Sequence, residues 1–171
     1  MHTNHKHTVP MSHDETHAEV TDRSLCQVKF FSRDSSLPVV LSPTEKRPLS
    51  EYRDDIDGMI RIYLSTVGGL LFRGFPIESA ADFELFVKMI SPHLASYEFG
   101  STPRSQVHNQ VYTSTEYPPH QSIPLHNEQA YTAEWPMKIW FYCARPSSEG
   151  GYTPIADSRE VYRHIPVRIR E

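Results

Sequence analysis

The sequence SIPLHNEQAYTAEWPMKIWFYCARPSSEGGYTPIAD, residues 122–157, carries a candidate metal-binding pair followed by the pattern of a β-strand and a glycine turn. His126 and Glu128 stand two positions apart, so in a strand both side chains would point to the same face. An imidazole and a carboxylate side by side can share one metal ion. The alternative is a solvated His126 whose ion pair with Glu128 contributes little stability. Spacing alone leaves both interpretations open.

Residues 137–143, which follow this pair, alternate as expected for a strand with both faces partly covered. One face would carry Met137, Ile139, Phe141 and Cys143, and the other Lys138, Trp140 and Tyr142. The SSEGG sequence at 147–151 predicts a turn, and SREVYRHI at 158–165 predicts a short helix before Pro166. The polar segment 91–124 has no sustained period, and loops of this length are usually functional or contain unrecognised strands.

Apolar residues at intervals of three and four predict a helix earlier in the chain, with Ser50 as its N-cap and Gly68 as its end. The following GLLFRGF, residues 69–75, predicts a short buried strand and a turn. Ser79 and Asp82 fit a capping box that opens a second helix. Its apolar face would consist of Phe83, Phe86, Val87 and Ile90. Both helices are expected to cover a sheet.

The pattern His-x-Glu occurs twice more, at His13/Glu15 and His17/Glu19. Composition alone predicts roughly one such pair by chance, so only its context can make the pattern informative. Residues 1–22 hold five of the ten histidines and hardly any large apolar side chains, which predicts a disordered, histidine-rich tail. Metal binding by this tail is the less favoured interpretation of its histidines.

The composition limits the partners of the chain. Its 171 residues suffice for one domain, and a net charge of −4 with interspersed signs favours neither nucleic acid nor an anionic membrane. Cys26 and Cys143 lack metal-type spacing, and Cys143 lies in an apolar run where we expect a buried free thiol. The most apolar stretch, residues 59–72, is too short to span a bilayer, and the N-terminus lacks a signal peptide's apolar segment. These features predict a soluble cytoplasmic protein without a membrane partner.

Three segments of the chain resemble one protein family: GGLLFRGFPIESAADFELF at 68–86, STPRSQVHNQVYTSTEYPPHQSIPLHNEQAY at 101–131 and GGYTPIADSREVYRHI at 150–165. They are similar to the taurine dioxygenase-like (TauD/TfdA) iron(II)- and 2-oxoglutarate-dependent oxygenases, most of all to the branch related to the syringomycin-biosynthesis protein SyrP. The resemblance runs from about residue 40 to the end. It implies an α+β, mainly β fold, a double-stranded β-helix or jelly roll with flanking helices.

This resemblance implies roles for individual residues. His126 and Glu128 match two iron ligands of the family, and Thr153 matches a threonine that hydrogen-bonds the distal carboxylate of 2-oxoglutarate. The alternative for Thr153 is a strand residue after the glycine turn. Asn109, Tyr112 and Glu116 lie in a segment that could line the substrate pocket; the alternative for them is a solvated loop.

The chain also departs from the family. The third iron ligand, a histidine far beyond the carboxylate, and the arginine that follows it and clamps 2-oxoglutarate have no counterpart here. Only His164 follows Glu128, and we expect it to be an exposed helix residue. Residues 23–171 are therefore expected to form the N-terminal part of a longer oxygenase domain, an incomplete jelly roll that is inactive alone.

The function implied by the resemblance is hydroxylation of an unactivated C–H bond with Fe(II), 2-oxoglutarate and dioxygen. The SyrP-like branch implies an amino acid substrate, small or tethered to a carrier protein, in secondary metabolism. A free small acid is the second substrate class. A catalytically inactive remnant or binding module of the same fold is the alternative outside enzymology.

Overall fold

The computed structural model describes residues 24–33, 35, 37–95, 104–114, 118 and 121–171, so the predicted tail lies outside the described residues. The described part contains two small sheets and several helices, an α+β arrangement. In chain order the elements are β1 (Cys26–Phe30), β2 (Val39–Pro43), the 3-10 helix η1 (Leu49–Tyr52), α1 (Arg53–Val67), β3 (Leu70–Phe72), α2 (Ala80–Ile90), β4 (Gln106–His108), β5 (Val111–Tyr112), α3 (Ser158–His164) and α4 (Val167–Arg170).

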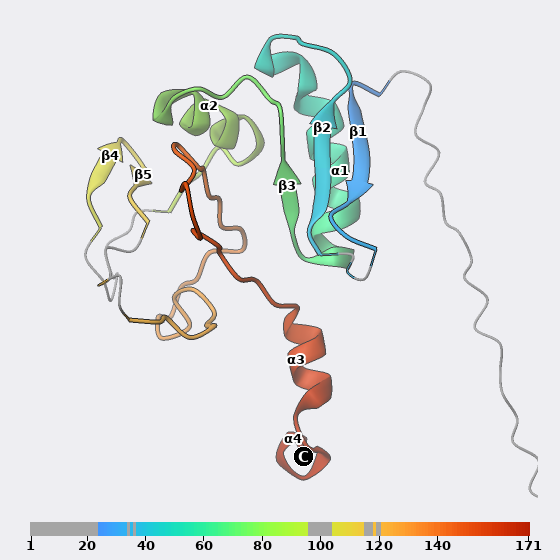
Figure 1. Cartoon of the computed structure of the whole chain (residues 1–171), viewed down its shortest axis with the longest axis vertical. Helices are drawn as coiled ribbons and strands as arrows, with labels where there is room; N and C mark the ends of the chain where they lie inside the picture. Colours follow the sequence, from blue (N-terminus) through green and yellow to red (C-terminus); the bar gives the residue numbers. More distant parts are fainter. Residues whose placement is uncertain (1–23, 34, 36, 96–103, 115–117, 119–120) are drawn as a thin grey trace, which may run out of the picture.

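The first sheet has the order β1-β2-β3, with β1 antiparallel and β3 parallel to β2. The parallel pair requires a crossover, which α1 provides by covering one face of the sheet (Figure 1). Val39 and Leu41 of the central strand are fully buried. Helix α1 thus covers the sheet, as predicted, whereas α2 contacts it through Phe86, whose ring meets Phe72 of β3. Both helices contribute to a common apolar core.

Helix α1 begins later than predicted. Ser50 lies inside η1, and the α-helix starts at Arg53 with Tyr52 as its N-cap residue. The Tyr52 ring at this junction is fully buried. Its hydroxyl accepts a hydrogen bond from the Arg47 amide at 2.8 Å and donates one to the Glu45 carbonyl. The predicted end is confirmed: Gly68 has a φ of 96° and its N–H bonds to Leu64 O.

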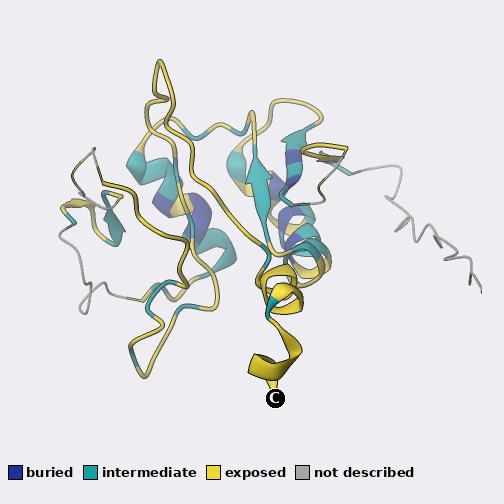
Figure 2. Cartoon of the chain, turned by 60° about the horizontal axis from the view of Figure 1, so that its bottom comes forward, coloured by how far each residue is buried: buried dark blue, intermediate teal, exposed yellow. Residues whose placement is uncertain are grey.

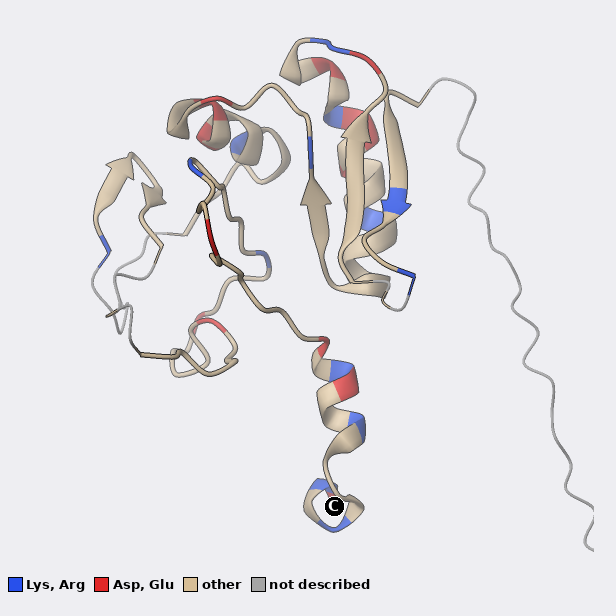
Figure 3. Ribbon diagram, viewed as in Figure 1, with Lys and Arg blue, Asp and Glu red and all other residues tan. Residues whose placement is uncertain are grey.

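Helix α2 begins as its sequence predicted. The Ser79 hydroxyl accepts a hydrogen bond from the Asp82 amide at 3.1 Å and donates one to the Asp82 carboxylate at 2.7 Å. These bonds and one from the Glu78 amide lower the pKa of Asp82. Acidic side chains gather at the first turns of α1 and α2, where the helix dipole favours them (Figure 3).

The core lies between α1, α2 and the first sheet. Its buried members are Cys26, Tyr52, Ile56, Ile60, Phe86 and Val87. Aromatic rings meet edge to face around them, with centroid distances of 5.3 Å for Tyr52–Phe75 and 5.2 Å for Phe72–Phe86. Fully burying one such side chain contributes about 1.5–3 kcal/mol. Figure 2 shows that most buried positions belong to these elements, whereas the C-terminal segments are exposed.

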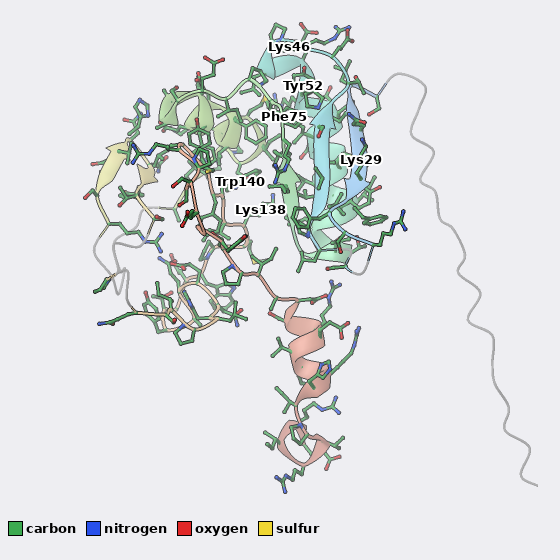
Figure 4. The ribbon with its side chains drawn as sticks, viewed as in Figure 1. Lys29, Lys46, Tyr52, Phe75, Lys138 and Trp140 are labelled. Atoms are coloured by element: carbon green, nitrogen blue, oxygen red, sulfur yellow. The ribbon has the colours of Figure 1, made fainter. Side chains whose placement is uncertain are left out.

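Residues 137–143 are extended, but among the described residues they pair with no strand. The prediction of a β-strand in a sheet is therefore wrong here. Its alternation is nevertheless present. Trp140, labelled in Figure 4, packs against Phe72 and Phe86. Tyr142 stacks on Phe83, with ring centroids 5.3 Å apart. The opposite face, which carries Met137, Ile139, Phe141 and Cys143, is exposed. The prediction of a buried Cys143 is therefore wrong, because the aromatic face takes the core side.

The structure confirms part of what the sequence predicted for the remaining segments. The expected loop at 91–124 contains a hairpin, β4–β5. The glycine turn is confirmed, since Gly150 and Gly151 have φ values of 65° and 71°. Helix α3 ends before Pro166, and His164 on it is exposed, as expected. In the described part of the chain, no helix is long and apolar enough to cross a membrane.

Candidate metal-binding site

His126 lies in the extended segment 122–127, which forms no strand in the described structure. Its ring is held by its own backbone, because Nδ1 lies 2.8 Å from the carbonyl oxygen of Pro124. A carbonyl can only accept, so Nδ1 carries the proton and donates it. In the neutral ring this leaves the lone pair on Nε2, the nitrogen directed away from the backbone.

Glu128 faces that nitrogen, with Oε2 3.7 Å from His126 Nε2. The predicted strand is wrong here, because a turn begins at Glu128: Gln129 has a φ of 54° and its carbonyl accepts the Thr132 amide at 3.1 Å. The predicted consequence of the spacing, two side chains on one side of the backbone, is nevertheless present. The His126 side chain is 59% exposed and that of Glu128 23%.

The second oxygen of Glu128 has a different neighbour. Arg104, two residues before β4, donates from Nη2 to Glu128 Oε1 at 3.2 Å. Both side chains are largely shielded, at 15% and 23% exposure. Glu128 therefore presents one oxygen to a guanidinium and the other to an imidazole. Sequence reasoning missed Arg104, although it stands within the STPRSQV segment that supports the family resemblance.

The donor pair fits two positions on a metal ion. Two neighbouring ligands of an octahedral ion, at about 2.1 Å from it, lie about 3 Å apart. The observed 3.7 Å is slightly wider, so a small side-chain rotation would bring both donors into place. A metal-binding histidine commonly donates its other ring N–H to a backbone carbonyl, as His126 does. The positions of His126 and Glu128 are thus compatible with two ligands of a divalent ion.

Other donors do not complete the set within the described residues, where no group of three or more His, Cys, Asp or Glu could hold an ion. His164 lies on α3, and its Nδ1 is 2.7 Å from the Glu160 carbonyl. Thr153 is exposed in the extended segment before α3, and no hydrogen bond joins it to His126 or Glu128 in the described structure. Glu116 lies outside the described residues.

Asn109 and Tyr112 belong to the β4–β5 hairpin, and Asn109 faces α2. Asn109 takes the left-handed conformation in the hairpin turn, with a φ of 38°. Its amide Nδ2 donates to Glu84 Oε2 at 3.0 Å. Tyr112 lies in β5, opposite Gln106, and is half-buried. In the described structure the Asn109 side chain therefore contacts Glu84 and, at 3.3 Å, the Nδ1 atom of His108.

Glu84, on α2, is a buried carboxylate that sequence reasoning also missed. Its side chain is 4% exposed and lies 2.5 Å from Lys88 Nζ and 2.5 Å from His108 Nδ1. Hydrogen bonds from Lys88, Asn109 and His108 outweigh desolvation and lower its pKa to about 2. A signal was present in the sequence, since Glu84 stands between Phe83 and Phe86 on the apolar side of the helix.

Comparisons with known proteins bear on this pair. A family model described as "Taurine catabolism dioxygenase TauD, TfdA family" matches residues 38–171. A clavaminate synthase-like protein of Arabidopsis thaliana is 36% identical over 129 residues, which are 75% of this chain and 38% of that protein. The dapdiamide synthesis protein DdaC of Enterobacter agglomerans is 42% identical over 106 residues, 62% of this chain and 32% of DdaC. The chain spans about a third of the length of these curated relatives.

Proposed function

The chain belongs to the TauD/TfdA dioxygenase family, and we propose that the complete protein is an Fe(II)- and 2-oxoglutarate-dependent dioxygenase that hydroxylates an unactivated C–H bond of an amino acid. One observation carries the proposal beyond the family: His126 Nε2 faces Glu128 Oε2 at 3.7 Å, with the ring fixed by Pro124. We also propose that residues 23–171 form the N-terminal part of a jelly roll, since the relatives are about three times as long as the matched segments.

His126 and Glu128 would hold the iron through one nitrogen and one oxygen. Bound iron and 2-oxoglutarate supply the activation of dioxygen, and the protein's residues orient and shield them. The Pro124 carbonyl keeps the His126 ring in the tautomer that a metal requires. Thr153 would donate its hydroxyl hydrogen to the distal carboxylate of 2-oxoglutarate. The third iron ligand and a basic partner of 2-oxoglutarate are assigned to other parts of the complete protein.

The substrate proposed is a small amino acid, free or tethered to a carrier protein. The relationship to DdaC, a protein of dapdiamide synthesis, supports a role in making a specialised metabolite. Tyr112 and Glu116, with the side-chain carbonyl of Asn109, are the proposed substrate contacts from the segment around β5. A free small acid is the second substrate class. The proposal further assigns the protein to the cytoplasm.

The test is Fe(II)-dependent formation of succinate from 2-oxoglutarate by the complete protein, with ascorbate and a panel of free and carrier-tethered amino acids. We expect one amino acid class to stimulate succinate, and His126→Ala or Glu128→Ala to abolish it. A variant that lacks both His13 and His17 should keep full turnover. Thr153→Ala should raise the KM for 2-oxoglutarate roughly ten- to a hundredfold, the loss of a hydrogen bond to a charged group. Absence of succinate with every amino acid would refute the amino acid substrate, and its absence with small acids as well would favour the inactive binding module.

A further inference from the structure

We propose that Arg104 is a positioning residue that holds Glu128 in a one-oxygen binding mode for the metal ion, an inference that rests on the proposed function. Arg104 Nη2 donates a hydrogen bond to Glu128 Oε1 at 3.2 Å. The other oxygen, Oε2, faces His126 Nε2. Arg104 would touch neither substrate nor metal. It would act on the metal ion through the Glu128 carboxylate.

The Arg104–Glu128 pair differs from the other arginine–carboxylate pairs of the described residues. Those pairs join residues two to four positions apart, and in each of them at least one side chain is 40% exposed or more. Arg104 and Glu128 are 24 positions apart and are only 15% and 23% exposed. Exposed local pairs contribute little, whereas a shielded pair between distant segments fixes their geometry and is costly to break. The contact therefore fixes the segment around Arg104 relative to the segment around Glu128.

The backbone that carries Arg104 is itself anchored. Next to it, the Ser105 amide donates to Thr113 Oγ1 at 2.9 Å, and the Thr113 amide donates to Ser105 O at 2.8 Å. At the far end of the hairpin, Asn109 is bonded to the buried Glu84 of α2. The Arg104 side chain thus extends from the hydrogen-bonded base of a hairpin, and this hairpin is fixed to α2. A side chain that starts from such a base can hold Glu128 in one orientation.

The chemical consequence concerns the two oxygens of Glu128. With Oε1 bonded to Arg104, rotation of the carboxylate is restricted and only Oε2 is available to an ion beside His126. Without the guanidinium both oxygens become available, so the carboxylate can turn away or bind through both. Loss of a group that orients a metal ligand typically weakens metal affinity 10- to 100-fold. Arg104 would thereby keep a coordination position open for other ligands.

The test measures Co(II) binding to the complete protein, because Co(II) reports affinity and coordination geometry through its visible absorption spectrum without turnover. Arg104→Met should raise the Kd for Co(II) by about 10- to 100-fold and change the spectrum. Arg104→Lys keeps the charge but not the planar fork, and should give an intermediate Kd with an altered spectrum. Arg61→Met, which removes an exposed helix-surface pair with Asp57, is the matched control and should match the wild type.

Far-UV circular dichroism identifies any variant that fails to fold, and the decision then rests on Arg104→Lys. A wild-type Kd and spectrum in both Arg104 variants, with Co(II) binding lost in Glu128→Ala, would overturn the role of Arg104 and leave the proposed function intact. If the wild type bound no Co(II), or Glu128→Ala bound it normally, the proposed function itself would fail and the inference with it.

Discussion

Glu84 shows how one residue links separate segments. It lies on α2 and is almost completely buried. Its carboxylate forms an ion pair with Lys88 of the same helix and contacts His108 and Asn109 of the β4–β5 hairpin. A buried carboxylate is costly unless its oxygens are paired, so these contacts must be retained together. Asn109, predicted to line a pocket, thus has at least one role in holding the hairpin to the core.

We predict that Glu84→Gln removes an acid-sensitive part of the stability. The pKa of Glu84 is lowered from 4.5 to about 2, so between these pH values the unfolded chain binds more protons. The ionised carboxylate therefore stabilises the fold fully above about pH 4.5 and loses this effect as the pH falls toward 2. Urea unfolding from pH 6 to pH 2 measures it: the difference between wild type and Glu84→Gln should shrink across this window. Glu149→Gln, an exposed change in the glycine turn, is the control, and a pH-independent difference for Glu84→Gln would refute the assignment.

The two cysteines differ for reasons that their sequence contexts do not reveal. Cys26 is buried, and desolvation with a contribution from Asp55 raises the pKa of its thiol to about 11. Cys143 is exposed because Trp140 and Tyr142 take the core side of its segment. Alternation separated the two sets of side chains, but the prediction that both faces are partly covered was wrong, because the face with Met137, Ile139, Phe141 and Cys143 is exposed. The sequence could not tell which face would meet the core, since both carry large apolar side chains.

At the level of elements, the helices were predictable because their signals are local. Ser79 caps α2 and Gly68 ends α1 through contacts within a few residues. Strands β1 and β2 were not predicted, because each is only five residues long, and they pair with each other across residues 31–38. The β4–β5 hairpin was not recognised because its turn, Asn109–Gln110, lacks the usual glycine.

Two glycines of α1 should respond oppositely to alanine. Gly58 lies in the helix interior and Gly68 at its end with a φ of 96°, and an added Cβ would meet nothing within 4 Å at either position. The effect of each substitution on stability therefore depends only on the backbone conformation of that glycine. Gly58→Ala should raise the free energy of unfolding by about 0.5–1 kcal/mol, and Gly68→Ala should lower it by about 1–2 kcal/mol. Urea denaturation at neutral pH measures both, and a stabilising Gly68→Ala would contradict the left-handed end of the helix.

For the whole molecule, apolar exposure is unevenly distributed. The core draws on elements up to α2 together with Trp140 and Tyr142, whereas many large apolar residues between Ile123 and Ile169 are exposed (Figure 2). Such surfaces commonly mark a place where another part of a protein packs. The expectation that the 171-residue chain is inactive alone stays a prediction, as does the jelly roll.

The metal site could be predicted from the sequence only as far as one pair. Spacing brought His126 and Glu128 together on one side of the backbone, and the structure shows their donor atoms facing each other. The Pro124 and Arg104 contacts could not be foreseen, because one depends on a ring rotation and the other on the packing of a distant hairpin. The Pro124 contact orients His126 and the Arg104 contact orients Glu128, but neither Pro124 nor Arg104 is a proposed metal ligand.

The most direct test of the central claim, that His126 and Glu128 bind iron, is an anaerobic equilibrium titration of the complete protein with Fe(II). We predict one tightly bound Fe(II) per wild-type molecule, and loss of that binding in both His126→Ala and Glu128→Ala, because each change leaves too few donors for the ion. The variant without His13 and His17 should bind as the wild type does. Unchanged Fe(II) affinity and stoichiometry in both His126→Ala and Glu128→Ala would contradict the account.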